Sequence, residues 1–210
     1  MRLGLFGGTF DPPHDGHLAV ARAARDQLAL DRVELIPTRV PPHRHAPSAS
    51  APDRFAMVAL AVLDEPRLVP SPREIVRDGV SYTVETLERL ATQRPEVEPF
   101  LVLGLDSYLD LPNWKQPARI TELAHLVIAP RPGARLALRE EDRPRLAAPG
   151  AHTSAGGPRR VFVLEMEEVP LSATALREAL ARGETPIRGL CGPVLRYVRK
   201  RGLYGVEETD

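Results

Sequence analysis

The feature that most constrains this fold is the alternation of short apolar runs with segments of helical periodicity. Apolar runs, most of them closed by Gly or Pro, predict buried strands at residues 2–6, 32–36, 67–69, 100–105, 125–129 and 161–164. Apolar residues at helical spacing, often with a cap or proline at the start, predict helices at residues 17–30, 53–63, 83–94, 118–123, 172–182 and 193–201. Strands that alternate with helices favour a parallel sheet covered on both faces.

We therefore predict an α/β fold, with a single Rossmann-like, doubly wound parallel sheet in one domain over residues 1–210. A small C-terminal helical part is expected at 172–204. Residues 74–77 are predicted to be extended. Residues 133–160 are polar, rich in Pro, Gly and Ala and weakly periodic, so we expect an irregular insertion there, with loops, a helix or disorder as the alternatives. Ligands of such sheets bind beyond the carboxyl ends of the strands, so the chemistry should lie in the loops after residues 6, 36, 103 and 164.

Charge and cysteine content exclude several classes of protein. Lys+Arg and Asp+Glu both number 28, which argues against a protein that coats nucleic acid or an anionic membrane. The single cysteine, Cys191, excludes an internal disulfide and a cysteine-based zinc cluster. No stretch approaches the roughly 20 apolar residues of a membrane span, and the N-terminal apolar run is too short for a signal peptide. We expect a cytoplasmic protein, with self-association left open.

The loop at residues 7–17 joins the first predicted strand to the first predicted helix. Gly7 and Gly8 let the backbone approach a ligand closely. The helix start offers N–H groups and a partial positive charge to a phosphate. His14 and His17 flank Gly16, so two imidazoles can face one phosphoryl group. Taken separately, these features fit an ordinary turn with two surface histidines equally well. The loop has neither a Walker A nor a Gly-x-Gly-x-x-Gly pattern.

Taken together, residues 7–17 resemble the signature of a known protein superfamily. His14-Asp15-Gly16-His17 matches the His-x-Gly-His core of the nucleotidyltransferase superfamily. The whole string Gly-Gly-Thr-Phe-Asp-Pro-Pro-His-x-Gly-His resembles the bacterial nicotinate-nucleotide adenylyltransferases. The resemblance implies that His14 and His17 are catalytic. It also implies that the backbone and side chains of this loop bind ATP, through Gly7, Gly8, Thr9, Phe10 and Gly16.

Two further segments extend the resemblance to the pyridine nucleotide. Alone, Val-Pro-Pro-His-Arg at residues 40–44 would be a solvated basic loop, but in this family His43 and Arg44 would face the substrate phosphate. The neighbouring Thr38 departs from the Asn common in relatives. Ser-Tyr-Thr at 81–83 could be a simple helix cap. By the resemblance, Tyr82 and Thr83 lie at the pyridine ring, where hydroxyl and N–H donors suit a ring carboxylate.

Residues after the fourth predicted strand add three more candidates. Gly104 and Asp106 follow the most apolar strand, where a carboxylate can accept from ribose hydroxyls of either nucleotide. Trp114, the only tryptophan, would most often be a core residue. The family's Pro-x-Trp motif implies instead that its ring stacks on the pyridine.

A second phosphate element lies near the C-terminus. Ser172 begins a helix, and Thr174 and Arg177 follow within its first turns, which suits an anion. Ordinary capping with a surface arginine explains these residues as well. The segment resembles the family's Ile-Ser-Ser-Thr-x-x-Arg, with Ala173 in place of the middle Ser. One hydroxyl is therefore lost, with a small expected effect on triphosphate binding. The resemblance implies that Arg177 is catalytic and that Ser172 and Thr174 bind ATP, as does Gly104.

The resemblance implies that the chain transfers AMP from ATP to nicotinate mononucleotide, giving nicotinate adenine dinucleotide and pyrophosphate in NAD biosynthesis. The attacking phosphate is already ionised at neutral pH, so no general base is required. Two anion-binding helix starts, at Gly16 and Thr174, must then converge on one triphosphate. Mg²⁺ should arrive with ATP, since no dedicated carboxylate cage is evident.

Other activities remain open at this point. Within the superfamily, the acceptor could be the amide mononucleotide or phosphopantetheine, or the donor could be CTP. His14, His17, His43 and His45 could instead form a metal site in a binding or hydrolytic protein. A nucleotide-binding regulator without turnover is the third class.

Overall fold

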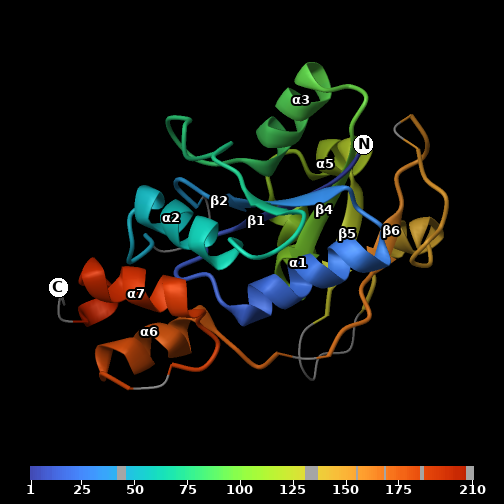
Figure 1. The fold of residues 1–210 in the computed structure, drawn as a ribbon. Helices are drawn as coiled ribbons and strands as arrows, with labels where there is room; N and C mark the ends of the chain where they lie inside the picture. Colours follow the sequence, from blue (N-terminus) through green and yellow to red (C-terminus); the bar gives the residue numbers. More distant parts are fainter. Residues whose placement is uncertain (42–45, 131–136, 155, 168, 185–186, 207–210) are drawn as a thin grey trace.

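Six parallel strands form one sheet in the order β3-β2-β1-β4-β5-β6 (Figure 1). This computed structural model describes residues 1–41, 46–130, 137–154, 156–167, 169–184 and 187–206. The strands are β1 (Arg2–Gly8), β2 (Arg32–Pro37), β3 (Leu68–Pro70), β4 (Glu98–Gly104), β5 (His125–Ala129) and β6 (Val161–Val163). The predicted doubly wound parallel sheet is confirmed.

The strand order reverses between β1 and β4, which pair side by side in the middle of the sheet. The chain moves outward from β1 through β2 to β3 and then returns to β4 on the other side of β1. The loops that leave β1 and β4 therefore diverge toward opposite faces and open a crevice at the carboxyl edge. The first loop and Gly104 both start at this crevice.

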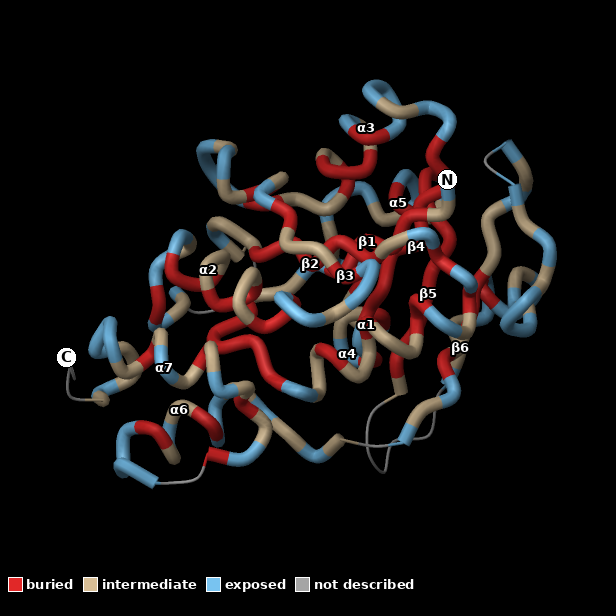
Figure 2. The backbone as a smooth tube through the Cα atoms, viewed as in Figure 1, coloured by how far each residue is buried: buried red, intermediate tan, exposed pale blue. Residues whose placement is uncertain are grey.

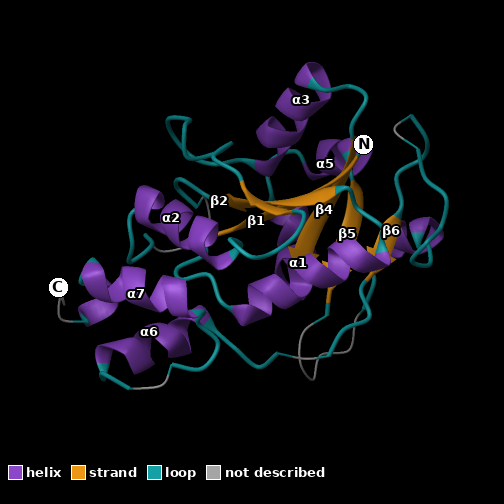
Figure 3. Cartoon of the chain, in the orientation of Figure 1, coloured by secondary structure: helices purple, strands orange, loops and turns teal. Residues whose placement is uncertain are grey.

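Helices cover both faces of the sheet, as Figure 3 shows. The longer helices are α1 (Asp15–Gln27), α2 (Ala51–Ala61), α3 (Thr83–Gln93), α5 (Pro117–Leu123), α6 (Ala173–Ala181) and α7 (Gly192–Lys200). Side chains alternate along each strand: Phe100 and Val102 pack with the α1 and α2 layer, and Leu101 and Leu103 pack with the α3 and α5 layer. The sheet is buried between them (Figure 2).

The C-terminal helices extend the first of these layers. Val194 and Val198 of α7 are fully buried in the same core cluster as Met57 of α2. The Tyr197 hydroxyl also lies 2.9 Å from Oδ1 of Asp53, which links α7 to the start of α2. A short 3₁₀ turn, η3 (Leu203–Gly205), follows α7. Among the described residues, no helix is long and apolar enough to cross a membrane.

Two local predictions were wrong. The glycine pair was expected to end the first strand, but β1 continues through Gly8, because its backbone keeps pairing with Pro37 of β2. Residues 74–77, predicted to be extended, form a turn in which Val76 N–H donates to the Pro72 carbonyl at 3.1 Å. This turn places the Glu74 side chain in the interior, where it accepts a hydrogen bond from Thr86 at 3.1 Å.

The chain also forms helical turns that the periodicity did not indicate. Helix α4 (Leu105–Asp110) starts directly after β4 and continues into η1 (Leu111–Asn113). In the segment predicted to be irregular, residues 140–145 form the 3₁₀ helix η2 (Glu140–Arg145).

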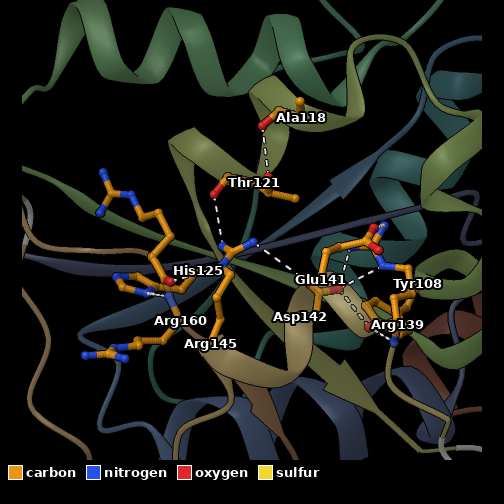
Figure 4. Close-up of polar contacts among 10 residues, drawn as sticks. Tyr108, Ala118, Thr121, His125, Arg139, Glu141, Asp142, Arg145 and Arg160 are labelled. Carbon is orange, nitrogen blue, oxygen red and sulfur yellow. Dashed lines mark hydrogen bonds and ion pairs between the residues drawn. The ribbon is translucent and has the colours of Figure 1, made fainter.

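A buried carboxylate fastens η2 to α4 (Figure 4). Asp142 is fully buried and accepts hydrogen bonds from the Tyr108 hydroxyl and from Nε of Arg139, both at 2.8 Å. Arg145 also contacts Asp142 and donates to the Thr121 carbonyl of α5 at 3.0 Å. Because a buried charge is tolerated only when it is paired, this segment supports the helix that carries Asp106.

Candidate active site

Two adjoining cavities lie at the carboxyl edge of β1 and β4. The smaller cavity, of about 320 Å³, faces the start of α3. The larger cavity, of about 1020 Å³, faces the starts of α1 and α6. They share a wall that includes Gly7, Gly8, Thr9 and Asp106. A Cβ added at Gly7 would have no atom within 4 Å, so a side chain there would take up open space that glycine leaves for a ligand. Two ligands bound in these cavities would meet at this wall.

The histidine pair of the first loop lines the larger cavity. The rings of His14 and His17 have centroids only 3.8 Å apart. A Cβ on Gly16 would lie 3.0 Å from Nδ1 of His14, so glycine is what allows the His14 ring to lie across the helix start. The His14 backbone N–H donates to Nδ1 of His17 at 3.2 Å. Since that nitrogen accepts, the proton of a neutral His17 resides on Nε2.

The imidazole of His14 is buried and electrically neutral in this state. Its side chain is nearly inaccessible, and Nδ1 has no hydrogen-bond partner among the described residues. Burial lowers the pKa of His14 to about 4. A buried polar atom without a partner is unfavourable, and an anionic phosphate in the cavity would stabilise a donor or a cation at this position.

Helix α6 brings the second predicted phosphate element to the same cavity. Ser172 caps the helix, since its hydroxyl accepts from Ala175 N–H at 3.1 Å. Thr174 and Arg177 line the larger cavity together with Gly16. Arg177 donates from Nη1 to the Asp11 carbonyl at 2.8 Å, across 166 residues of sequence. The two helix starts therefore face one space, as the adenylyl-transfer interpretation requires.

The smaller cavity gathers the residues expected at the pyridine ring. Tyr82, Thr83, Asp106 and Trp114 all line it. The indole Nε1 of Trp114 donates to Asp110 at 3.2 Å, which fixes the ring at the rim of the cavity instead of in the core. Tyr82 is the N-cap of α3 and makes no side-chain cap, so an acceptor in the cavity can approach the helix start.

His43 and Arg44 lie outside the described residues, as does His45. Their described neighbours border the site: Pro41 lines the smaller cavity and Ala46 lines the larger one. The roles that the sequence suggested for His43 and Arg44 stay predictions.

Comparisons with known proteins agree with this geometry. A cytidylyltransferase-like family model matches residues 5–179. A protein of Aeromonas hydrophila named probable nicotinate-nucleotide adenylyltransferase is 40% identical over 206 residues, which covers 96% of both chains. Its counterpart in Desulfatibacillum aliphaticivorans is 38% identical over 217 residues, covering 97% of this chain and all of the relative. The chain belongs to the nicotinate-nucleotide adenylyltransferase family.

Solved structures share the fold of this family. Nicotinic acid mononucleotide adenylyltransferase of Plasmodium falciparum superposes with a TM-score of 0.77 over 99% of each chain at 13% identity. The crystal structure of a protein from Vibrio parahaemolyticus, named putative nicotinate-nucleotide adenylyltransferase, superposes with a TM-score of 0.65 at 18% identity and covers 97% of this chain and 95% of that one.

A buried polar network lies behind the first loop, and the sequence analysis did not predict it. Asp11 is buried and accepts from Ser48 N–H at 2.7 Å and from the Tyr204 hydroxyl at 2.7 Å. Arg54 is also buried and donates to the Thr9 carbonyl at 2.8 Å. Tyr204 holds a left-handed backbone conformation, with φ 60°, which is costly for a bulky residue and persists only where the surroundings fix it. In the sequence, Gly202-Leu203-Tyr204 near the C-terminus resembles a segment of this family, and this is the one sequence signal for the network.

Acidification is expected to destabilise the nucleotide-free enzyme through His14. The pKa of His14 is 6.5 in the unfolded chain, whereas burial lowers its pKa to about 4 in the folded chain. Between these values the unfolded state binds more protons, so the free energy of unfolding falls as the pH is lowered, by on the order of 3 kcal/mol for this group. Urea unfolding at a series of pH values would measure the slope.

The matched variant for this measurement is His14→Asn, which cannot titrate. Burial also lowers the pKa of His125, which is present in both proteins and contributes the same slope to each. The wild-type enzyme should therefore lose more stability than His14→Asn between pH 6.5 and pH 4. Identical slopes would show that His14 is not held neutral.

Proposed function

We propose that this protein transfers the AMP part of ATP to nicotinate mononucleotide, which yields nicotinate adenine dinucleotide and pyrophosphate for NAD synthesis. The observation that carries the proposal is the pair of helix starts, at Gly16 and Thr174, on one large cavity that adjoins a pyridine-sized one. The solved Plasmodium falciparum relatives are complexed with APC and with NaAD, respectively. We further propose a cytoplasmic enzyme that acts on freely diffusing nucleotides.

In the proposed reaction, a phosphate oxygen of the mononucleotide attacks the α-phosphorus of ATP. A new P–O bond forms, the bond from the α-phosphorus to the bridging oxygen breaks, and pyrophosphate leaves with the electron pair. The attacking phosphate has a second pKa near 6, so it needs no general base at neutral pH. The protein has to place two anions in line and offset their repulsion.

The donors around the larger cavity suit that task. His17 would direct its Nε2 proton toward phosphate oxygens, because Nδ1 is occupied by the His14 N–H. The N–H groups at the starts of α1 and α6 add partial positive charge. Arg177 adds a full charge, and its contacts with Asp11 and Thr174 hold the guanidinium in place. Each donor stabilises charge that grows on the leaving pyrophosphate.

We propose that Mg²⁺ enters as part of the substrate, bound to the triphosphate. The described residues include no group of three or more His, Cys, Asp or Glu side chains arranged to hold a metal ion. Phosphate oxygens would then supply ligands of the ion, which neutralises part of the triphosphate charge.

Purified protein incubated with Mg²⁺ tests the proposal through pyrophosphate release. ATP with nicotinate mononucleotide should give steady release and a product with the mass of nicotinate adenine dinucleotide. Phosphopantetheine as the acceptor, or CTP as the donor, should give little pyrophosphate release. Release that is faster with either of these than with nicotinate mononucleotide and ATP would overturn the assignment.

Trp114→Ala should weaken the binding of the pyridine nucleotide more than the binding of ATP. The indole lines both cavities. Its Nε1 donates to Asp110, which holds the ring beside the smaller cavity, where the pyridine would stack. Losing one aromatic stacking contact should raise KM for nicotinate mononucleotide by roughly 10-fold. Steady-state kinetics with each substrate varied in turn measures both values. An equal rise for ATP would argue against a pyridine-specific role.

A further inference from the structure

The smaller cavity contains a basic side chain that the proposed function has not used. In the described part of the chain, Lys115 is the sole basic residue among its lining side chains. It is also one of only two lysines in the chain, the other being Lys200. Lys115 follows Trp114 directly, so the element that presents the indole also presents an ammonium group.

The ammonium group of Lys115 lies at the start of α3, beside the predicted ring pocket. Its Nζ sits 4.4 Å from the centroid of the Tyr82 ring and 2.8 Å from Oε1 of Glu85. Tyr82 is the N-cap of α3 and lines the same cavity. The ammonium is therefore held over the aromatic residue that borders the cavity, by a cation–π contact and an ion pair.

At the start of α3 two basic side chains lie beside one carboxylate, although Asp106 and Asp110 also line the cavity. Glu85 pairs with Lys115 and also with Arg77, so two cations share one carboxylate. The partial positive charge of the α3 N-terminus adds to the charge of these two cations. Glu74, a buried carboxyl on the cavity wall, has a pKa raised by burial.

The two pyridine mononucleotides differ in the group that this region would meet. Nicotinate bears a ring carboxylate with a full negative charge, and nicotinamide bears a neutral amide. Backbone N–H groups can donate to either ligand, since both offer a carbonyl-type oxygen as the acceptor. A fixed ammonium discriminates far more strongly, because a charge-to-charge hydrogen bond is roughly twice as strong as a neutral one.

We propose that Lys115 is a specificity-determining residue, whose ammonium group pairs with the ring carboxylate and thereby selects the acid over the amide mononucleotide. This inference rests on the proposed function and deepens it. In the bound state the ammonium shares its donors between Glu85 and the ligand, which its three N–H bonds allow. The contact with Tyr82 keeps the group at the cavity when Glu85 is the only acceptor.

The test compares Lys115→Gln and Lys115→Arg with the wild-type enzyme, using nicotinate and nicotinamide mononucleotides. Lys115→Gln retains a donor for Glu85 but has no charge, so kcat/KM for the acid should fall about 10-fold or more, with little change for the amide. Lys115→Arg keeps the charge and should recover most of the acid activity. Lys200→Gln on α7, at the far C-terminal helix, is the control and should match the wild type. The dissociation constants of both mononucleotides, measured by calorimetry, should follow the same pattern.

The possible outcomes separate the two proposals. An unchanged acid-to-amide ratio in Lys115→Gln, or an equal loss with both mononucleotides, overturns the role of Lys115 while wild-type turnover leaves the proposed function standing. If the wild-type enzyme forms no dinucleotide from either mononucleotide, the proposed function fails and this inference fails with it.

Discussion

His17→Ala is expected to lower kcat by roughly 100-fold or more, which is the scale of removing one preorganised donor from a developing oxyanion. His17 lines the larger cavity, and its Nδ1 accepts from the His14 backbone, so a neutral His17 carries its proton on Nε2. Alanine removes that donor and leaves the helix start and Arg177 in place. Pyrophosphate release at saturating ATP and mononucleotide measures the loss.

A second substitution at this position separates chemistry from packing. The His17 ring also packs edge-on against Phe10, with centroids 4.9 Å apart, so alanine leaves a small gap. His17→Asn can keep an acceptor for the His14 N–H, but it has no counterpart of Nε2. It should be nearly as slow as His17→Ala while its melting temperature stays closer to that of the wild type. His152→Ala, at an exposed histidine, is the control. Near-normal turnover of either His17 variant would refute the assigned role.

Arg54→Met is expected to reduce the free energy of unfolding by about 3 kcal/mol or more. Arg54 is 1% exposed, and its guanidinium donates to the carbonyls of Thr9, Arg39 and Ala49. These carbonyls belong to the loop after β1, the loop after β2 and the entry to α2. Methionine fills much of the volume but leaves these three acceptors without this donor and removes a cation that interacts electrostatically with Asp11.

Urea denaturation measures this loss, and Arg182→Met is the matched control. Arg182 is exposed and pairs only with a neighbouring carboxylate, so its replacement should change stability by less than about 1 kcal/mol. Because Arg54 ties two substrate loops together, KM values for both nucleotides should also rise in Arg54→Met. A stability equal to that of the control variant would show that the three carbonyls find other donors and that Arg54 is dispensable.

The strands could be predicted because their cause is local. Runs such as Phe100–Leu103 are apolar on both sides, and a parallel sheet covered by two helix layers requires that pattern. The turn at 74–77 could not be predicted, because it depends on a side chain of α3, Thr86, that receives Glu74 in the interior. Helix η2 likewise depends on Asp142 meeting Tyr108, which is 34 residues away.

The candidate site shows the same division. His14, Gly16 and His17 lie within one turn, so their spacing alone carries their geometry. The contact of Asp11 with Tyr204 spans 193 residues, and that of Lys115 with Glu85 spans 30. Such pairs produce no periodicity and no motif. A buried arginine such as Arg54 also looks like any polar residue of an amphipathic helix until its three carbonyl partners are seen.

The convergence of the two helix starts is tested most directly by nuclear magnetic resonance of the ¹⁵N-labelled protein during titration with a non-hydrolysable ATP analogue and Mg²⁺. The backbone amide signals of Gly16 and His17 on α1 and of Thr174 and Ala175 on α6 should shift together, with one shared dissociation constant. Signals from Glu122 and Leu123, at the end of α5 and outside the lining of both cavities, should stay in place. If only one helix start responds, or if the two saturate at different concentrations, a single triphosphate does not bridge them, and the adenylyl-transfer account is contradicted.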